Sequence, residues 1–169
     1  LKNFFALILT AILCCNAVNA QEYFTIKQYD VHIKVNQDAS LDIDETINVH
    51  FTEPRHGIIR MIPFKYQLQS LPEGTEKANR QMESGGYAHT FIKDIKVDGW
   101  NYDLSTEGDY KLIKIGSADQ LVDGDQRYVI HYRLLNAINF FNDHAELYFN
   151  VIGDKWETTI DSVSFTVEL

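Results

Sequence analysis

Residues 29–51, YDVHIKVNQDASLDIDETINVHF, decide the fold, because their apolar side chains recur at every second position. Before residue 36 these apolar residues alternate with Asp30, His32 and Lys34, and after residue 40 with a second polar set. The segment between them, 36–39 (NQDA), has the composition of a turn. A period of two indicates strands with one buried face. The stretch therefore predicts an antiparallel hairpin whose other face is wet.

The same period continues along the chain. We expect a second hairpin, in which strands 91–97 and 100–104 are joined by a type I′ turn at Asp98-Gly99. Further strands are expected over the ranges 110–115, 128–134 (after a turn at Asp123-Gly124), 146–151 and 163–169. About seven or eight short strands of this kind predict an all-β fold, an antiparallel β-sandwich of immunoglobulin-like or jelly-roll-like type. Residues 135–141 could hold a short helical turn.

One long polar loop is expected over 65–90, a range that contains Pro72, Gly74, Gly85 and Gly86. Within it, 76–82 could form a turn or two of helix. Loops of this length inside a compact domain tend to be functional or disordered. We therefore expect a single domain over 21–169 with this loop as a candidate contact surface.

Residues 1–20 have the pattern of a secretory signal peptide. Lys2 precedes an apolar run of about ten residues, and the segment ends in Ala17-Val18-Asn19-Ala20, which suits cleavage after Ala20. The apolar run has about half the length of a membrane span. An uncleaved tether and a lipoprotein anchored through Cys14 or Cys15 are the alternatives. In each case residues 21–169 are expected to be exported, to the periplasm or the cell surface.

The composition excludes several classes of function. Both cysteines of the chain, Cys14 and Cys15, lie in the predicted signal peptide, so the mature domain would have no disulfide, thiolate metal site or thiol nucleophile. The chain has 15 basic and 24 acidic residues and a net charge of -9. Such a surface repels the phosphate backbone of nucleic acids. We expect no nucleic-acid partner and no cofactor.

Glu45 breaks the alternation, because it lies in phase with the apolar residues of 41–49. A buried carboxylate without a partner costs several kcal/mol. The best candidate partner is Arg60, in the apolar segment 57–63, with Arg55 and His56 as alternatives. The favoured interpretation is a structural ion pair, and the other is an acid whose protonation is poised by burial.

The segment 143–146, DHAE, is the only cluster with the composition of a metal site. On a strand, His144 and Glu146 would share a face, but their spacing matches no established zinc motif. They are therefore only weak candidate ligands. The favoured interpretation is that Glu146 forms an ion pair with a cation.

Three aromatic residues, Trp100, Tyr102 and Trp156, could form a platform that stacks on a sugar. Core or cross-strand packing is the commoner role of such residues.

Several short motifs occur in order along the chain: 44–47 (DETI), 56–63 (HGIIRMIP), 113–116 (IKIG), 128–132 (YVIHY) and 146–153 (ELYFNVIG) followed by Trp156. Together they resemble the N-terminal region of domain-of-unknown-function family 2207, a bacterial family of predicted membrane proteins. The resemblance implies an extracytoplasmic β domain, with membrane association through a C-terminal region that this chain does not contain. It supplies no catalytic residues. Glu45, Arg60, Glu146 and Trp156 match motif positions and are expected to be structural first.

These observations favour a non-enzymatic envelope domain that binds a protein or glycan partner. Its sheet edges and its 65–90 loop are the candidate contact surfaces. One alternative is a hydrolase of envelope polymers that uses Glu45 or Glu146 as its acid, with Asp143 or His144 nearby. Another is a carbohydrate-binding module.

Overall fold

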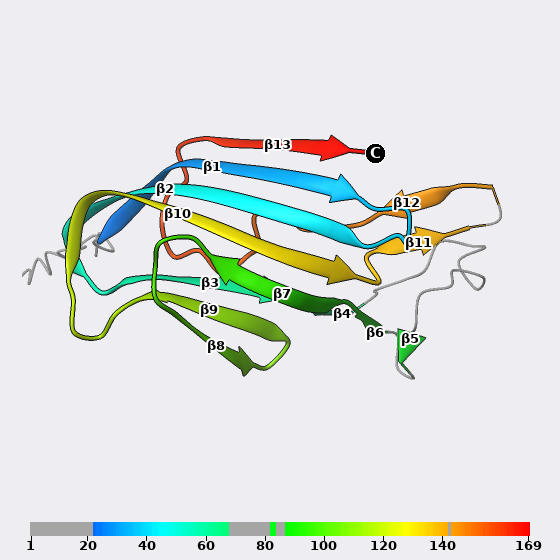
Figure 1. Ribbon diagram of the computed structural model, residues 1–169, viewed down its shortest axis with the longest axis horizontal. Helices are drawn as coiled ribbons and strands as arrows, with labels where there is room; N and C mark the ends of the chain where they lie inside the picture. Colours follow the sequence, from blue (N-terminus) through cyan, green and yellow to red (C-terminus); the bar gives the residue numbers. More distant parts are fainter. Residues whose placement is uncertain (1–21, 68–81, 84–86, 142) are drawn as a thin grey trace, which may run out of the picture.

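The computed structural model describes residues 22–67, 82–83, 87–141 and 143–169. The expected signal peptide, 1–20, lies outside them. The described residues form strands and connections without any helix, which confirms the all-β prediction. Figure 1 shows two layers, a five-stranded sheet above a three-stranded sheet, stacked as in a β-sandwich.

The larger sheet has the strand order β13-β1-β2-β10-β7. Its strands are β1 (Phe24–Val35), β2 (Leu41–Arg55), β7 (Phe91–Val97), β10 (Val122–Leu135) and β13 (Val163–Glu168). The predicted first hairpin is confirmed, because β1 and β2 pair antiparallel from Phe24↔Phe51 to Val35↔Leu41. Along both strands buried and solvent-facing residues alternate, as the sequence period requires.

The smaller sheet has the order β3-β9-β8, with strands β3 (Gly57–Pro63), β8 (Tyr102–Glu107) and β9 (Tyr110–Gly116). It begins at a close approach of two backbones, where Gly57 and Gly116 lie opposite each other at φ +123° and +130°. A Cβ on Gly57 would lie 1.9 Å from the carbonyl oxygen of Ile115, and one on Gly116 would lie 1.8 Å from that of His56. Only glycine fits at either position.

The core lies between the two sheets. Its buried residues come from the inner faces of β1, β2, β3, β9 and β10, with Val97 from β7 and Ala137 just after β10. Its largest apolar members include Ile26, Ile33, Leu41, Ile43, Ile47, Ile62, Ile113, Ile115 and Ile130. Among them are buried Glu45 and Arg60.

The predicted hairpin at Asp98-Gly99 is wrong. β7 pairs with β10 and β8 pairs with β9, so the connection crosses from one sheet to the other. The Asp98 amide donates to the Val129 carbonyl at 3.0 Å, which keeps the chain in the first sheet up to this point. A type I′ turn needs positive φ at both residues, but only Gly99 has it, at +71°.

The predicted turn at Asp123-Gly124 is also wrong, because both residues lie inside β10. The register of β10 against β2 shifts between Val122 and Gly124, and Gly124 has φ +60°. The glycine therefore marks a β-bulge in a continuous strand, not a connection between two strands.

The expectations for the segments 65–90, 135–141 and 146–151 also need correction. Part of the polar segment 65–90 forms a small sheet of β4 (Lys65–Gln67), β6 (Tyr87–His89) and β5 (Met82–Glu83). Residues 68–81 and 84–86, which include most of the helix expected over 76–82, lie outside the described residues. Strand β11 (Ile138–Phe140) replaces the helical turn expected over 135–141, and it pairs with β12 (Ala145–Leu147), which is shorter than the strand expected over 146–151.

Strand β13 differs from expectation in two respects. It pairs with β1 in parallel, whereas every other strand pairing in the described residues is antiparallel. Its alternating sequence predicted one buried face, yet all six residues are exposed. The reason is its position: β13 is the edge of the wider sheet, beyond the reach of the three-stranded sheet that covers its neighbours (Figure 1).

Candidate functional site

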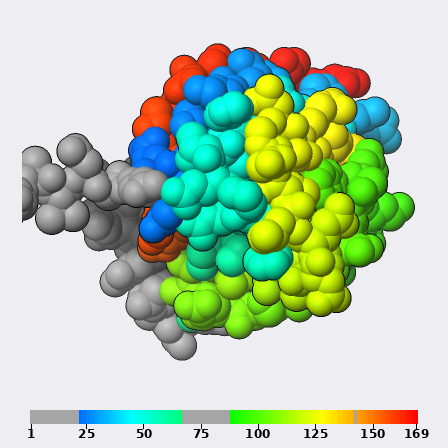
Figure 2. All heavy atoms as spheres, turned by 90° about the vertical axis from the view of Figure 1, so that its left-hand side faces the viewer, coloured from blue at the N-terminus to red at the C-terminus, as the bar shows by residue number. Residues whose placement is uncertain are grey.

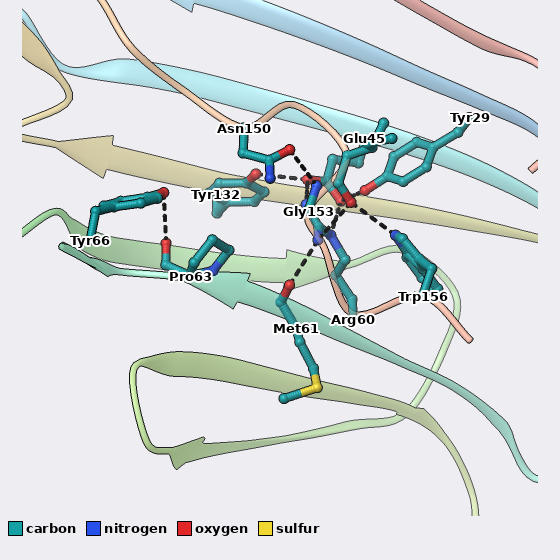
Figure 3. Close-up of polar contacts among 11 residues, drawn as sticks. Tyr29, Glu45, Arg60, Met61, Pro63, Tyr66, Tyr132, Asn150, Gly153 and Trp156 are labelled. Atoms are coloured by element: carbon teal, nitrogen blue, oxygen red, sulfur yellow. Dashed lines mark hydrogen bonds and ion pairs between the residues drawn. The ribbon is translucent and has the colours of Figure 1, made fainter. Parts of the chain in front are cut away.

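Glu45 lies on the inner face of β2 and is completely buried. Its direct cross-strand neighbours, Val31 and Ile130, are apolar. The carboxylate nevertheless accepts four hydrogen bonds, two from Arg60 and one each from Tyr29 and Tyr132 (Figure 3). The charge is thus compensated by a cation and by hydroxyl donors rather than by water.

Arg60 reaches this carboxylate from β3, in the opposite sheet. Its Nε donates to Oε2 of Glu45 at 2.8 Å, and one terminal nitrogen donates to Oε1 at 2.7 Å. The other terminal nitrogen donates to the carbonyl oxygens of Met61, at 2.8 Å, and Ile152, at 3.2 Å. The bidentate pair therefore joins the two sheets to each other and to the segment that precedes β13.

Two tyrosine hydroxyls complete the coordination of the carboxylate. Tyr29 Oη donates to Oε2 and Tyr132 Oη donates to Oε1, both at 2.7 Å. Tyr29 lies opposite Ile47 and Tyr132 opposite Ile43, so both are diagonal neighbours of Glu45 on the flanking strands. Sequence reasoning did not include them in the site. The sequence did carry a sign of them: both tyrosines occupy positions that the alternation assigns to the buried faces of β1 and β10, and a buried hydroxyl needs a hydrogen-bond partner.

Trp156, in the segment that precedes β13, packs against Tyr29 and Arg60 of the site. Its ring meets that of Tyr29 edge-on at 6.0 Å, and the Arg60 guanidinium carbon lies 6.0 Å from its centroid. Trp156 Nε1 donates to the Ile152 carbonyl at 2.9 Å, the same oxygen that Arg60 uses. Gly153, at φ +80°, passes so close that a Cβ on it would lie 2.5 Å from a terminal nitrogen of Arg60. We call these six residues, Tyr29, Glu45, Arg60, Tyr132, Gly153 and Trp156, the Glu45–Arg60 site.

The electrostatics of the site keep both tyrosines and Arg60 in their protonated forms. Burial raises the pKa of Tyr29 and of Tyr132 well above that of a free tyrosine, and the Glu45 carboxylate adds to both shifts. Burial alone would lower the pKa of Arg60, but the Glu45 carboxylate, together with Tyr29 and Tyr132, outweighs this effect and holds that pKa well above its ordinary value. Both oxygens of Glu45 are occupied and shielded from solvent, so a dissolved substrate has no path to them. The geometry is that of a structural cross-link, and it removes support from a hydrolase that uses Glu45 as its acid.

The other predicted acid, Glu146, is placed differently. It is exposed on β12, opposite Asn139, and it has no ion pair within the described residues. Because its carboxylate remains in contact with water on this peripheral two-stranded sheet, it needs no cation. It does not join the Glu45–Arg60 site.

The weak candidate metal ligands do not form a centre either. His144 Nδ1 lies 2.8 Å from Oδ1 of its neighbour Asp143, and its ring stacks on Phe141. In the described part of the chain, no group of three or more His, Cys, Asp or Glu side chains is arranged to hold a metal ion.

The three predicted platform aromatics do not share a surface. Trp156 belongs to the Glu45–Arg60 site. Tyr102 is partly buried and donates its hydroxyl to the Ile95 carbonyl at 3.0 Å. Trp100 packs on Tyr128 at a centroid distance of 4.8 Å and also borders a groove at one end of the molecule.

A row of charged groups crosses the solvent-facing side of the larger sheet. Nδ1 of His131 lies 2.6 Å from Asp44, and its Nε2 lies 3.1 Å from Asp98. On β1, the other neighbour of β2, His32 lies 3.9 Å from Asp44 of β2 and 3.5 Å from Glu168 of β13. The hydrogen bond to Asp44, with a further contribution from Asp98, raises the pKa of His131 despite partial burial. The alternation predicted His32 on the wet face of its strand but gave no sign of this cross-strand row.

The fold and the site define a class: an all-β, two-layer domain cross-linked by a buried ion pair. The chain belongs to the family described as "Predicted membrane protein (DUF2207) N-terminal domain", which matches residues 25–169 and confirms the resemblance found in the sequence. Within the described residues, no helix has the length and apolar character needed to cross a membrane.

A curated relative is the "Uncharacterized protein YciQ" of Escherichia coli (strain K12). The two sequences are 28% identical over 148 residues, which are 85% of this chain. The chain spans only 22% of the length of that relative.

Solved structures resemble the chain only distantly. Yeast LTA4 hydrolase in complex with bestatin has a TM-score of 0.38 and 10% identity, over 66% of this chain and 14% of that one. An M1 zinc metallopeptidase from Deinococcus radiodurans has a TM-score of 0.36 and 11% identity, over 68% and 20%. Likeness at this level carries no argument about function.

Proposed function

We propose that this chain is the non-enzymatic, extracytoplasmic part of a membrane protein, and that it binds a protein partner by strand addition at β13. The observation that carries the proposal is the open edge of β13. Among the described residues, no strand lies beyond β13 in the larger sheet. An open sheet edge is a template on which an extended segment of another protein can pair.

The backbone of β13 is oriented for such pairing. The Tyr29 amide donates to the Ser162 carbonyl at 2.9 Å, so the even-numbered residues direct their backbone groups toward β1. In a parallel ladder, alternate residues point the opposite way. The amides and carbonyls of Val163, Phe165 and Val167 are therefore directed to the open side.

The side chains of the same three residues form an apolar row on the inner side of the sheet. Val163, Phe165 and Val167 are 43%, 61% and 41% exposed, although their register partners in β1, Tyr29, Val31 and Ile33, are buried. A strand added at this edge would place its own alternate residues beside this row and extend the core outward.

The opposite face of the edge indicates the chemistry of the partner. It carries Asp30, hydrogen-bonded to Ser164, and Glu168, which lies near Lys34 and His32. With a net charge of -9, the chain favours cationic partners. The proposed occupant is an extended protein segment with apolar residues at alternate positions and basic residues between them.

Hydrogen exchange with designed peptides tests the edge directly. The probes are a synthetic peptide of alternating valine and lysine and the same composition in scrambled order. We expect the alternating peptide to protect the amides of Val163, Phe165 and Val167. Phe165→Lys should abolish this protection, because it places a charge in the apolar row, whereas the uncharged change Thr166→Gln on the opposite face should not.

Two results would overturn the proposed mode of binding. One is the absence of protection with either peptide. The other is protection of the same amides, without peptide, in a longer form of the protein that includes residues after 169, because the edge would then be covered by the protein's own chain.

The proposed side of the membrane has a separate test. Alkaline phosphatase fused after residue 169 should be active, because this reporter folds only after export. Green fluorescent protein fused at the same position should be dark. The reverse pair of results would contradict an extracytoplasmic location.

A further inference from the structure

The second surface that suggests a function is a groove at the end of the sandwich where β2 leads into β3 and β9 leads into β10. Three connections meet there: His56, the segment 99–101 and the segment 116–122. Figure 2 views the molecule from this end, with atoms of β2 and β10 side by side and those of β8 and β9 below. The groove has a volume of about 300 Å³, and its lining includes His56, Trp100, Asn101, Ser117, Gln120 and Val122. We call it the end groove.

We propose that the end groove binds a neutral hydroxylated ligand, such as one sugar residue at the end of a glycan, against the ring of Trp100. This site is separate from β13, so it does not depend on the strand-addition proposal.

Trp100 offers an apolar surface that is held in place. One side of its ring packs on buried Tyr128, with the centroids 4.8 Å apart. Its Nε1 donates to the Arg127 carbonyl at 3.0 Å, so its only polar group is already used. What remains for the groove is ring carbon, the surface on which the C–H face of a sugar packs.

The polar groups around this ring can form directional hydrogen bonds. Nδ1 of His56 lies 3.0 Å from the Ser117 carbonyl and 3.3 Å from the Gln120 carbonyl. Both partners can only accept, so Nδ1 carries the proton, and in the neutral ring Nε2 is an acceptor. The exposed side chains of Asn101 and Gln120 add amide donors and acceptors. Such groups match the hydroxyls of a sugar.

The charge of the lining narrows the ligand class. None of the described residues that line the end groove is acidic, although the chain contains 24 Asp and Glu residues. A cation would find no carboxylate there, and an anion would be repelled by the net charge of -9. A neutral ligand avoids both penalties. The volume lies at the small end of the range of about 300–1,000 Å³ for ligand pockets, which suits a single ring.

The groove is also rigid at its base. The Gly116 amide donates to the Asn101 carbonyl at 2.8 Å, and this hydrogen bond joins the two segments that line the groove, 99–101 and 116–122. Gly116 itself lies against the His56 backbone at the close approach with Gly57 described above. A preorganised site loses less entropy when a ligand binds.

The test is a titration of the folded chain, followed by NMR and tryptophan fluorescence. The probes are glucose, N-acetylglucosamine and their short oligomers, with glucuronic acid and calcium as charged controls. We expect a neutral sugar to shift the Trp100 indole signal and the side-chain amides of Asn101 and Gln120. Trp156→Phe leaves Trp100 as the only tryptophan and should retain the fluorescence response.

Exposed side chains provide the variants, because their loss should not disturb folding. Asn101→Ala combined with Gln120→Ala should weaken the binding by tenfold or more. The matched control is Gln37→Ala, an exposed amide in the turn between β1 and β2 at the other end of the sheet, which should bind like the wild type. The proposal is overturned if no neutral sugar shifts these signals, if only glucuronic acid or calcium does, or if the double variant binds with unchanged affinity.

Discussion

Arg60 donates to both carboxylate oxygens of Glu45, at 2.8 and 2.7 Å, across the space between the two sheets. Both side chains are at most 1% exposed, so the pair is dry. In such surroundings the loss of one partner leaves an uncompensated charge, which is far more costly than the loss of a surface pair. The pair therefore makes the packing of one sheet on the other depend on two particular residues.

The tyrosine hydroxyls should contribute measurably to this site. Tyr29→Phe and Tyr132→Phe each remove one hydrogen bond to the buried carboxylate and keep the ring. Hydrogen bonds to charged groups are worth about 1.5–3 kcal/mol, so we expect a loss of this size in the free energy of unfolding for each variant. Denaturant titration measures it.

Tyr128→Phe is the matched control for these two variants. The hydroxyl of Tyr128 is buried and has no hydrogen-bond partner among the described residues, and burial raises its pKa to about 12. Removing it should leave stability unchanged or slightly improved. Equal losses of stability in all three variants would contradict the claim that the hydroxyls of Tyr29 and Tyr132 stabilise the protein through their hydrogen bonds to Glu45.

Gly153 should tolerate a side chain poorly, because a Cβ there would lie 2.5 Å from a terminal nitrogen of Arg60. Gly108 provides the control, since it also has positive φ, at +54°, but nothing lies within 4 Å of its would-be Cβ. Gly108→Ala should cost about 1–2 kcal/mol through backbone strain alone. Gly153→Ala should cost about 1–3 kcal/mol more, as overpacking does. Equal thermal shifts in the two variants would contradict a clash with Arg60.

Stability should fall as the pH rises through the range in which His131 loses its proton. Asp44 and Asp98 raise the pKa of His131 in the folded state, so the folded protein binds this proton more tightly than the unfolded chain. The stabilisation is complete below the ordinary histidine pKa of about 6.5 and is lost as the pH rises through the higher, folded-state value. Three other charged or titratable residues lie near this group: His32, which is close to Asp44 and Glu168, and Lys96, which is the register partner of His131.

His131→Gln tests this expectation, with unfolding followed at a series of pH values from 5.5 to about 8.5. The decline in stability above the ordinary histidine pKa should be shallower in this variant. Asp98→Asn is the companion variant, because it keeps His131 but removes one of the two carboxylates that raise its pKa, so its slope should also be shallower than that of the wild type. A His131 variant with an unchanged slope would contradict the assignment.

The first hairpin and its buried carboxylate could be predicted from the sequence because both depend on local alternation. Glu45 stands in the apolar phase of its strand, so a partner was required wherever the strand lay in the sheet. The pairing of β7 and β8 was not predictable in this way. A Gly after Asp98 signals a change of direction, but not which sheet the next strand joins.

Two other features depend on strand neighbours, which alternation does not reveal. Tyr29 and Tyr132 meet Glu45 only because β1 and β10 flank β2 in one particular register. The alternation of β13 predicts a buried face, yet Phe165 is 61% exposed because the second layer ends before this strand. The order of the strands determines which side chains reach Glu45, and the width of the second sheet determines whether β13 is covered.

The most direct measurement is the unfolding free energy of Glu45→Gln, compared with Asp42→Asn. Asp42 is the control because it forms an exposed pair with Arg133, at 2.7 Å, on the other face of the same strand. If Glu45 is the structural cross-link described here, its variant should lose about 3–5 kcal/mol. The melting temperature should fall by roughly 6–20 °C, while Asp42→Asn melts close to the wild type. A Glu45→Gln protein that melts like the wild type would contradict the account.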